Sequence, residues 1–194
     1  MVSGRANYIF GFLVLVMLGL SVYVFYFLPG PERTRAEPEK VRVVASDLSA
    51  ERLKQLRLEY THTIQPDITQ IQKNLERLIQ QYRKVIRDAE RTGDMFATYH
   101  NLGVIQEQAR AFEAYVFLPD HLPDDVRETI EGAMSNYKDA ADAIKLACAE
   151  LRNAIDGGGF RSAEMALGFT QSAESSRTDG DVKILLAKRL LGFK

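Results

Sequence analysis

The sequence predicts an all-α protein: a single N-terminal transmembrane helix followed by an antiparallel helical bundle of three long and one or two short helices. Residues 8–28 carry no charge, apolar residues recur at steps of three and four through most of residues 46–194, and no stretch alternates with a period of two. The chain accordingly divides into an N-terminal tail (1–7), a transmembrane helix (8–28), a flexible linker (29–45) and a helical bundle domain (46–194).

Residues 8–28 are long enough to cross a bilayer, because a helix of ~20 residues spans the roughly 30 Å of hydrocarbon. A cleaved signal peptide is the alternative, but its apolar core is only ~7–15 residues long and a cleavage site follows it closely. We therefore expect an uncut anchor and a single-pass protein with the lipid bilayer as its first partner. The residues expected to span the membrane are Ile9, Phe12, Leu15, Leu18, Leu20, Val24 and Phe27.

The flanks of this run give two opposed indications of orientation. Arg5 precedes it, whereas Arg33, Arg35, Lys40 and Arg42 follow it. Counting Lys and Arg favours a cytoplasmic bundle domain. Short-tailed anchors, however, often translocate a long following domain, and a flank rich in proline and glutamate is typical of a solvated stalk. We expect an extracytoplasmic domain, although the flanking charge favours the opposite side.

The first long helix of the bundle is predicted to cover residues 46–92. Over residues 64–89 its apolar positions alternate steps of four and three, which is a heptad repeat. Pro66 removes a backbone hydrogen bond, so we expect a helix kink or a short break near Gln65. The repeat could also form a dimeric coiled coil, but folding back covers this face and the later apolar faces together. We therefore expect a bundle domain that is monomeric.

Further helical stretches follow. Asp94 is the predicted N-cap of a second helix that continues to Leu118, before Pro119. A third helix starts at Asp124 and ends at the glycines 157–159. A shorter fourth covers about 160–175, a turn is predicted at 176–180, and a last helix covers 181–191. That last helix is apolar on two sides, which leaves open whether it docks on the bundle or contacts a membrane or a partner.

Composition excludes two classes of protein. The chain has 25 basic and 26 acidic residues, a balance that predicts no nucleic-acid partner. Its one cysteine, Cys148, excludes a disulfide scaffold and is expected to be a small buried hydrophobe.

Two groups of residues have the composition of metal sites. Glu59 and His62 have the Glu-x-x-His spacing of di-iron bundles, but neither other histidine supplies a second pair, and a polar helix face is expected instead. The second group lies around a proline-bounded loop and an acidic helix start, which explain it without a metal: His121, Asp120, Asp124 and Asp125. We therefore expect no metal, no cofactor, no catalytic residues and no enzymatic activity.

Together these observations predict a membrane-anchored helical interaction module, a scaffold or adaptor that presents its bundle to an unidentified protein partner at a cell envelope. The layout of one N-terminal anchor and an all-helical domain resembles that of many small bacterial envelope proteins. The alternative function is a ligand-sensing or ligand-carrying helical domain, which requires a pocket between helices. A metal-dependent enzyme is the third hypothesis.

Overall fold

The computed structural model describes residues 49–193, and all regular secondary structure among them is helical, which confirms the all-α prediction. No helix in this part of the chain is long and apolar enough to cross a membrane. The predicted transmembrane helix, 8–28, and the predicted linker, 29–45, lie outside the described residues. The elements are α2 (Ala50–Glu59), the π-helical turn η2 (Tyr60–Ile64), α3 (Gln65–Thr92), α4 (Met95–Arg110), α5 (Asp124–Asn153), the π-helical turn η3 (Ala154–Gly158) and α6 (Gly159–Leu190).

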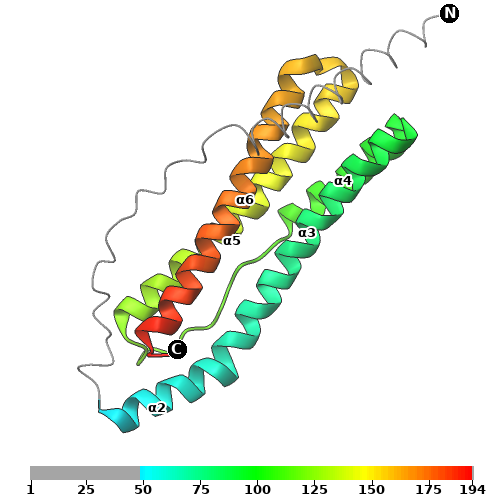
Figure 1. Cartoon of the computed structure of the whole chain (residues 1–194). Coiled ribbons are helices and arrows are strands. Elements are labelled where there is room, and N and C mark those ends of the chain that lie inside the picture. Colours follow the sequence, from blue (N-terminus) through cyan, green and yellow to red (C-terminus); the bar gives the residue numbers. More distant parts are fainter. Residues whose placement is uncertain (1–48, 194) are drawn as a thin grey trace, which may run out of the picture.

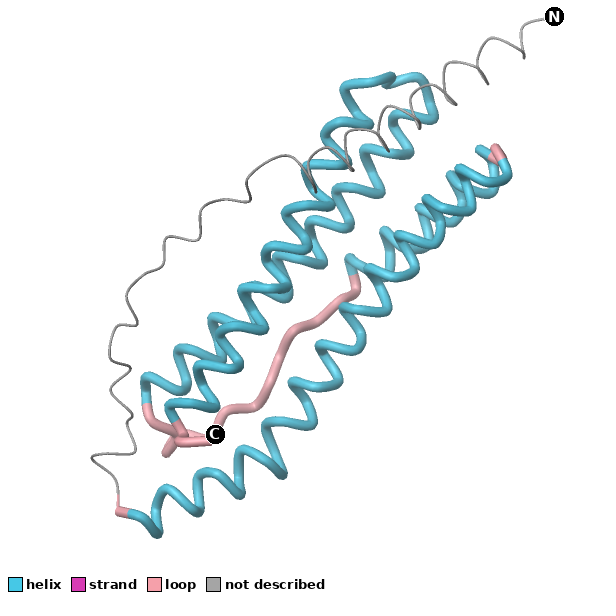
Figure 2. Tube along the Cα trace, viewed as in Figure 1, coloured by secondary structure: helices cyan, strands magenta, loops and turns pink. Residues whose placement is uncertain are grey.

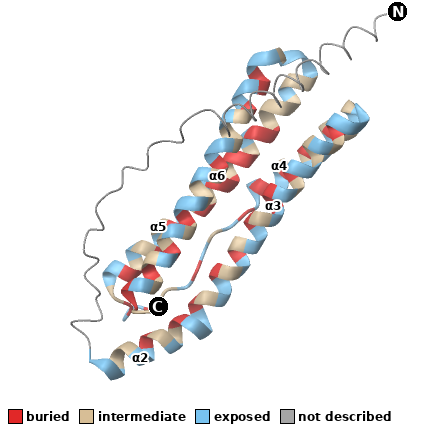
Figure 3. Cartoon of the chain, viewed as in Figure 1, coloured by how far each residue is buried: buried red, intermediate tan, exposed pale blue. Residues whose placement is uncertain are grey.

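The helices form an elongated bundle. α3, α5 and α6 follow its long axis, and α2 bends away from that axis at one end (Figure 1). α5 and α6 form an antiparallel hairpin with the most extensive helix contact, and α4 packs against α5 and α3. Buried residues line the inner faces of these helices (Figure 3). The predicted helical bundle is thus confirmed for the described residues.

The wide turn η2 lies directly before Pro66, where the sequence predicts a kink. Apolar residues at steps of four drift by about 40° per step around an α-helix. A π-helical turn offsets that drift, and Tyr60, Ile64 and Ile68 are all buried. Pro66 lies in the first turn of α3, directly after the π-helical turn, and this wider turn accommodates a residue that has no N–H to donate.

The heptad face of α3 packs into the core of its own chain. Gly93, at φ +66°, ends the helix as predicted, and Asp94 accepts a hydrogen bond from the Ala97 N–H as the predicted N-cap of α4. The buried residues of this face are Ile68, Ile71, Leu75, Leu78, Ile79, Tyr82 and Ala89. Folding back therefore covers the seam that a dimeric coiled coil would otherwise need.

The predicted second helix, Asp94 to Leu118, is wrong in its last third. α4 ends at Arg110, and residues 112–119 form an extended segment, which we call the strap. Figure 2 shows the strap continuing the course of α4 along the bundle. The strap is rich in aromatic and β-branched residues, and Pro119 favours an extended residue before it. An extended chain also covers about twice the distance per residue of a helix. The short strap is therefore long enough to connect the end of α4 to the loop before α5.

The predicted turn at 176–180 is also wrong, because α6 runs unbroken from Gly159 to Leu190. Gly180 lies inside the helix, where a Cβ atom would come within 2.5 Å of the Tyr137 ring. This glycine serves the close approach of α6 to α5, so its place in the sequence does not mark a turn. The helical path does break between α5 and α6, where Gly157 and Gly159 have φ values of +111° and +67°.

The C-terminal part of α6 docks on the bundle. Arg57 of α2 donates hydrogen bonds to the carbonyl oxygens of Leu191 and Gly192, both at 2.7 Å. The Phe193 ring packs 5.5 Å from the Tyr60 ring. One side of this helix end is buried through Ile184, Ala187, Leu190 and Leu191.

Candidate interaction surface

The strap is tied to α5 at its two ends. Lys138 donates a hydrogen bond to the Phe112 carbonyl oxygen at 3.1 Å, and Arg127 donates one to the Pro119 carbonyl oxygen at 2.6 Å. The two cations lie three helical turns apart on α5, so they fix the strap along that length. Phe112 also borders the α3 residue Leu78, which places the start of the strap between α3 and α5.

Residues 112–118 of the strap alternate between its two faces. Phe112 and Val116 are buried, Ala114 and Leu118 are partly buried, and the residues between them are exposed. This period of two is the pattern of a β-strand on a hydrophobic core.

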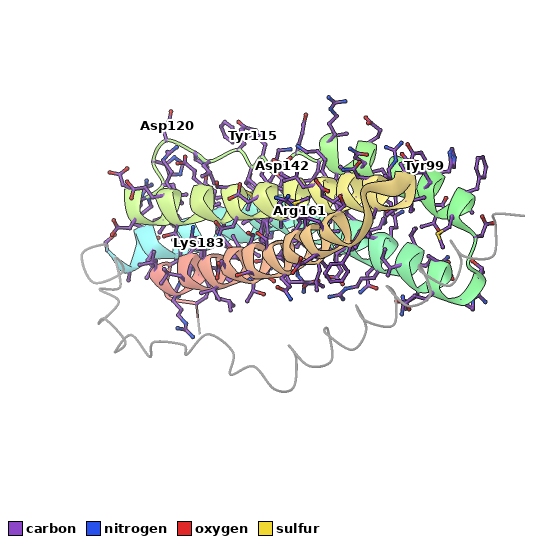
Figure 4. All side chains as sticks on the ribbon, turned by 90° about the horizontal axis from the view of Figure 1, so that it is seen from above. Tyr99, Tyr115, Asp120, Asp142, Arg161 and Lys183 are labelled. Atoms are coloured by element: carbon purple, nitrogen blue, oxygen red, sulfur yellow. The ribbon has the colours of Figure 1, made fainter. Side chains whose placement is uncertain are left out.

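The outward face of the strap is aromatic. The Tyr115 side chain is 74% exposed and that of Phe117 is 62% exposed. In Figure 4 the Tyr115 and Asp120 labels mark the side of the bundle where this segment runs along α5. Two neighbouring exposed aromatic rings are the residue types that dominate protein–protein contacts.

The strap also presents unpaired backbone groups. Within the described part of the chain, no hydrogen bond involves the N–H or carbonyl groups of residues 113–118. An extended segment with free N–H and carbonyl groups is a template for another extended chain, as at the edge of a sheet.

A groove of about 410 Å³ lies beside the strap. It is lined by Met134 and Ser135 of α5, and by Arg127 and Lys138 of the same helix. The groove combines apolar surface with two partly buried cations and the exposed acid Glu131. This combination of an apolar surface with charged side chains is suited to holding a short extended peptide.

Residues of the two groups that have the composition of metal sites make other contacts in the structure. Glu59 does not act with His62, which is exposed, and instead lies 2.6 Å from the His121 ring. Asp120 faces Arg127 at 4.0 Å. Between Ser49 and Phe193 no three His, Cys, Asp or Glu residues lie close enough together to hold a metal. The Glu59–His121 contact ties the end of α2 to the loop before α5.

A second groove, of about 610 Å³, lies between α3 and α6. At its floor Gln72 donates to the Tyr137 hydroxyl at 2.7 Å, and that hydroxyl donates to Asp181 at 2.7 Å. Burial raises the pKa of Tyr137, and its hydrogen bond to the Asp181 carboxylate raises it further. Arg177 of α6 pairs with Glu76 of α3 at 2.5 Å across the same groove. These polar groups already satisfy one another, so they hold α3 to α6 without a ligand.

Cys148 is fully buried, which confirms the prediction of a small buried hydrophobe. Burial raises the pKa of its thiol to about 12. The thiol is therefore protonated at neutral pH and is not a nucleophile.

Comparison with protein-family models, with curated proteins and with solved structures finds no match. The class of the protein therefore follows from its own geometry, a helical bundle with one extended, aromatic-faced segment. The sequence did not single out Tyr115 and Phe117. The available signal was the run Phe112–Glu113–Ala114–Tyr115–Val116–Phe117–Leu118, in which both faces are mostly apolar.

Proposed function

We propose that this chain is a membrane-anchored helical interaction module, a scaffold or adaptor whose strap binds a protein partner. The observation that carries the proposal is the outward face of the strap, where Tyr115 and Phe117 are exposed side by side with unpaired backbone groups. Single exposed rings such as Phe96 are common on protein surfaces, whereas two adjacent exposed rings form a patch of the kind that marks a contact.

The geometry favours an extended segment of the partner. Residues 113–118 present N–H and carbonyl groups for strand pairing, and the adjacent groove accepts side chains between Arg127 and Lys138. Recognition of this kind obtains affinity from main-chain hydrogen bonds and specificity from pockets for alternate side chains. The partner segment would therefore be a short run of alternating residues with one apolar face.

Photo-crosslinking in the native membrane tests this proposal. A benzophenone amino acid at Tyr115 or Phe117 of the full chain is expected to give one discrete crosslinked product. Matched probes at Phe96 and Phe160, which are 87% and 46% exposed but lie off the strap, should not give that product. The same product from all four positions, or none from the strap, would contradict the assignment.

The membrane anchor at 8–28 is part of the same proposal and has its own test. The chain should stay with membranes through an alkaline wash, and its N-terminus should be uncut. We place the bundle on the extracytoplasmic side, where protease added to intact cells would digest it. Protection of the bundle in intact cells would reverse this orientation, which the flanking Lys and Arg count also opposes.

The ligand-carrying alternative rests on the groove between α3 and α6. Its rim has exposed Lys73 and Arg77, and its floor is the hydrogen-bonded Gln72 and Tyr137 pair. A bound small molecule would have to displace bonds that the helices already make. We therefore place the partner site on the strap, and we expect the bundle on its own to be monomeric.

A further inference from the structure

The outer face of α3 carries basic side chains at a heptad spacing. This row, which we call the basic line, lies on the side of α3 opposite its buried residues. All of its members are exposed: Lys73, Arg77, Gln80, Lys84, Arg87 and Arg91. Steps of four, three, four, three and four keep them in one row about 27 Å long.

Of the basic residues in this row, only Arg91 pairs with an acidic residue of α3 within the described residues. Glu76 reaches across to Arg177 of α6, and Asp88 lies beside the row, where it pairs with Arg91 at 3.3 Å. Among the residues that the structure describes, no acidic group lies within ion-pair distance of Lys73, Arg77, Lys84 or Arg87. These four charges are therefore available to an external anion.

The bundle is also electrically polarised across its width. α5 begins with exposed acids on its own outer face, Asp124, Glu128 and Glu131. Because α3 and α5 pack through their buried faces, these acids and the basic line lie on different sides of the bundle. Such a distribution orients a protein on an anionic surface, with the basic side inward.

We propose that the basic line docks the bundle on an anionic lipid surface. This proposal rests on the membrane anchor of the proposed function. The line contains no apolar side chain, so it offers nothing for the dry centre of a protein interface. The predicted span ends at residue 28, and the chain to Ser49 keeps the bundle within about 75 Å of the bilayer. Tethering at that distance gives a weak electrostatic contact a high effective concentration.

The test uses the full chain in lipid nanodiscs, with a dye on Gln80→Cys and an acceptor dye on the lipid headgroups. Cys148 does not compete for the label, because its buried thiol stays protonated. Energy transfer should rise about twofold when zwitterionic lipid is partly replaced by anionic lipid, and fall back in about 1 M salt. A dye on Ser135→Cys of α5 should show no such rise. Only the requirement for anionic lipid matters here, so the side of the membrane does not affect the result.

The variant Lys73→Gln, Arg77→Gln, Lys84→Gln, Arg87→Gln should lose the rise while melting like the parent chain. A matched control removes four exposed charges elsewhere, Lys54→Gln, Arg110→Gln, Arg161→Gln and Arg189→Gln, and should keep it. Exchanging Lys for Arg and Arg for Lys within the line should also keep it.

Three results would overturn the proposal: transfer that does not depend on lipid charge, an equal loss in the control, or a rise at Ser135→Cys. Energy transfer that does not depend on lipid charge is also the result expected if the basic line binds an acidic protein instead of lipid. Failure of the anchor is distinguished separately, because the chain would then leave discs of either lipid.

Discussion

The strap and the α5–α6 hairpin differ in how completely the fold accounts for their residues. In the hairpin, Gly180 admits the Tyr137 ring, and the Tyr137 hydroxyl is bonded to both Gln72 and Asp181. In the strap, two cations hold the ends while Tyr115 and Phe117 face solvent. Packing and hydrogen bonds account for these residues of the hairpin, whereas the Tyr115 and Phe117 rings of the strap are mostly exposed. The exposure of these two rings is the observation that indicates an external contact.

The largest expected effect concerns the buried face of α3, which belongs to the core. Leu75 of α3 is 1% exposed, and Leu75→Asp would bury an unpaired charge and lose a leucine contact worth ~2–5 kcal/mol. Against a total stability of roughly 5–15 kcal/mol, we expect this variant to unfold. Circular dichroism of the full chain in detergent measures this. Asn74→Asp, at the exposed neighbour, should melt like the parent chain.

The hairpin also predicts the reactivity of Cys148. Raising a thiol pKa from 9.0 to about 12 lowers the thiolate fraction about a thousandfold at pH 8. Because the thiol is also fully buried, alkylation in the folded protein should be at least about a thousandfold slower than alkylation of an exposed cysteine. Because the folded state holds this proton more tightly, the stabilising contribution is present below pH 9 and is lost as pH rises toward 12. Rapid labelling at pH 8 under native conditions would show that α5 and α6 open locally.

Substitution of two glycines of α6 tests how closely α6 approaches α5. Gly180→Ala should destabilise the fold by ~1–3 kcal/mol, because its Cβ meets the Tyr137 ring. Gly168→Ala has no atom within 4 Å of the new Cβ and should stabilise by ~0.5–1 kcal/mol through helix propensity. Thermal melts of the two variants give the comparison. A gain in stability at Gly180 would refute the close approach.

A smaller effect is expected where the strap is tied. Lys138→Met removes the hydrogen bond to the Phe112 carbonyl and should cost about 1 kcal/mol. Limited proteolysis should then cut residues 112–119 faster than in the parent chain. Lys145→Met, which removes a cation paired with Asp142 on the same helix, should leave the strap cleavage unchanged. Equal cleavage of the two variants would mean that Lys138 does not hold the strap.

The sequence predicted most helices because steps of three and four recur along the chain, but it missed the strap for a physical reason. Phe112 and Val116 are four residues apart, a spacing that fits one face of a helix and also one face of a strand. The alternation that separates the two is hidden, because the outward residues Tyr115 and Phe117 are themselves apolar.

The same limit applies to contacts between distant residues. From the sequence alone, Gly180 predicts a turn. Its role is evident only from its close approach to Tyr137, which lies on another helix. The meeting of Gln72, Tyr137 and Asp181 likewise depends on three helices. Spacing along one chain segment carries no information on such contacts.

The most direct measurement of the central claim is a comparison of stability and complex formation in the double variant Tyr115→Ala, Phe117→Ala. Both rings are mostly exposed, so the free energy of unfolding should change by no more than ~0.5 kcal/mol. Native electrophoresis of mildly solubilised membranes should show that the variant no longer migrates in a complex, whereas the control Phe96→Ala, Phe160→Ala still does. If the double variant melts several degrees lower, the rings serve the fold. If it still migrates in the complex, the strap is not the partner site.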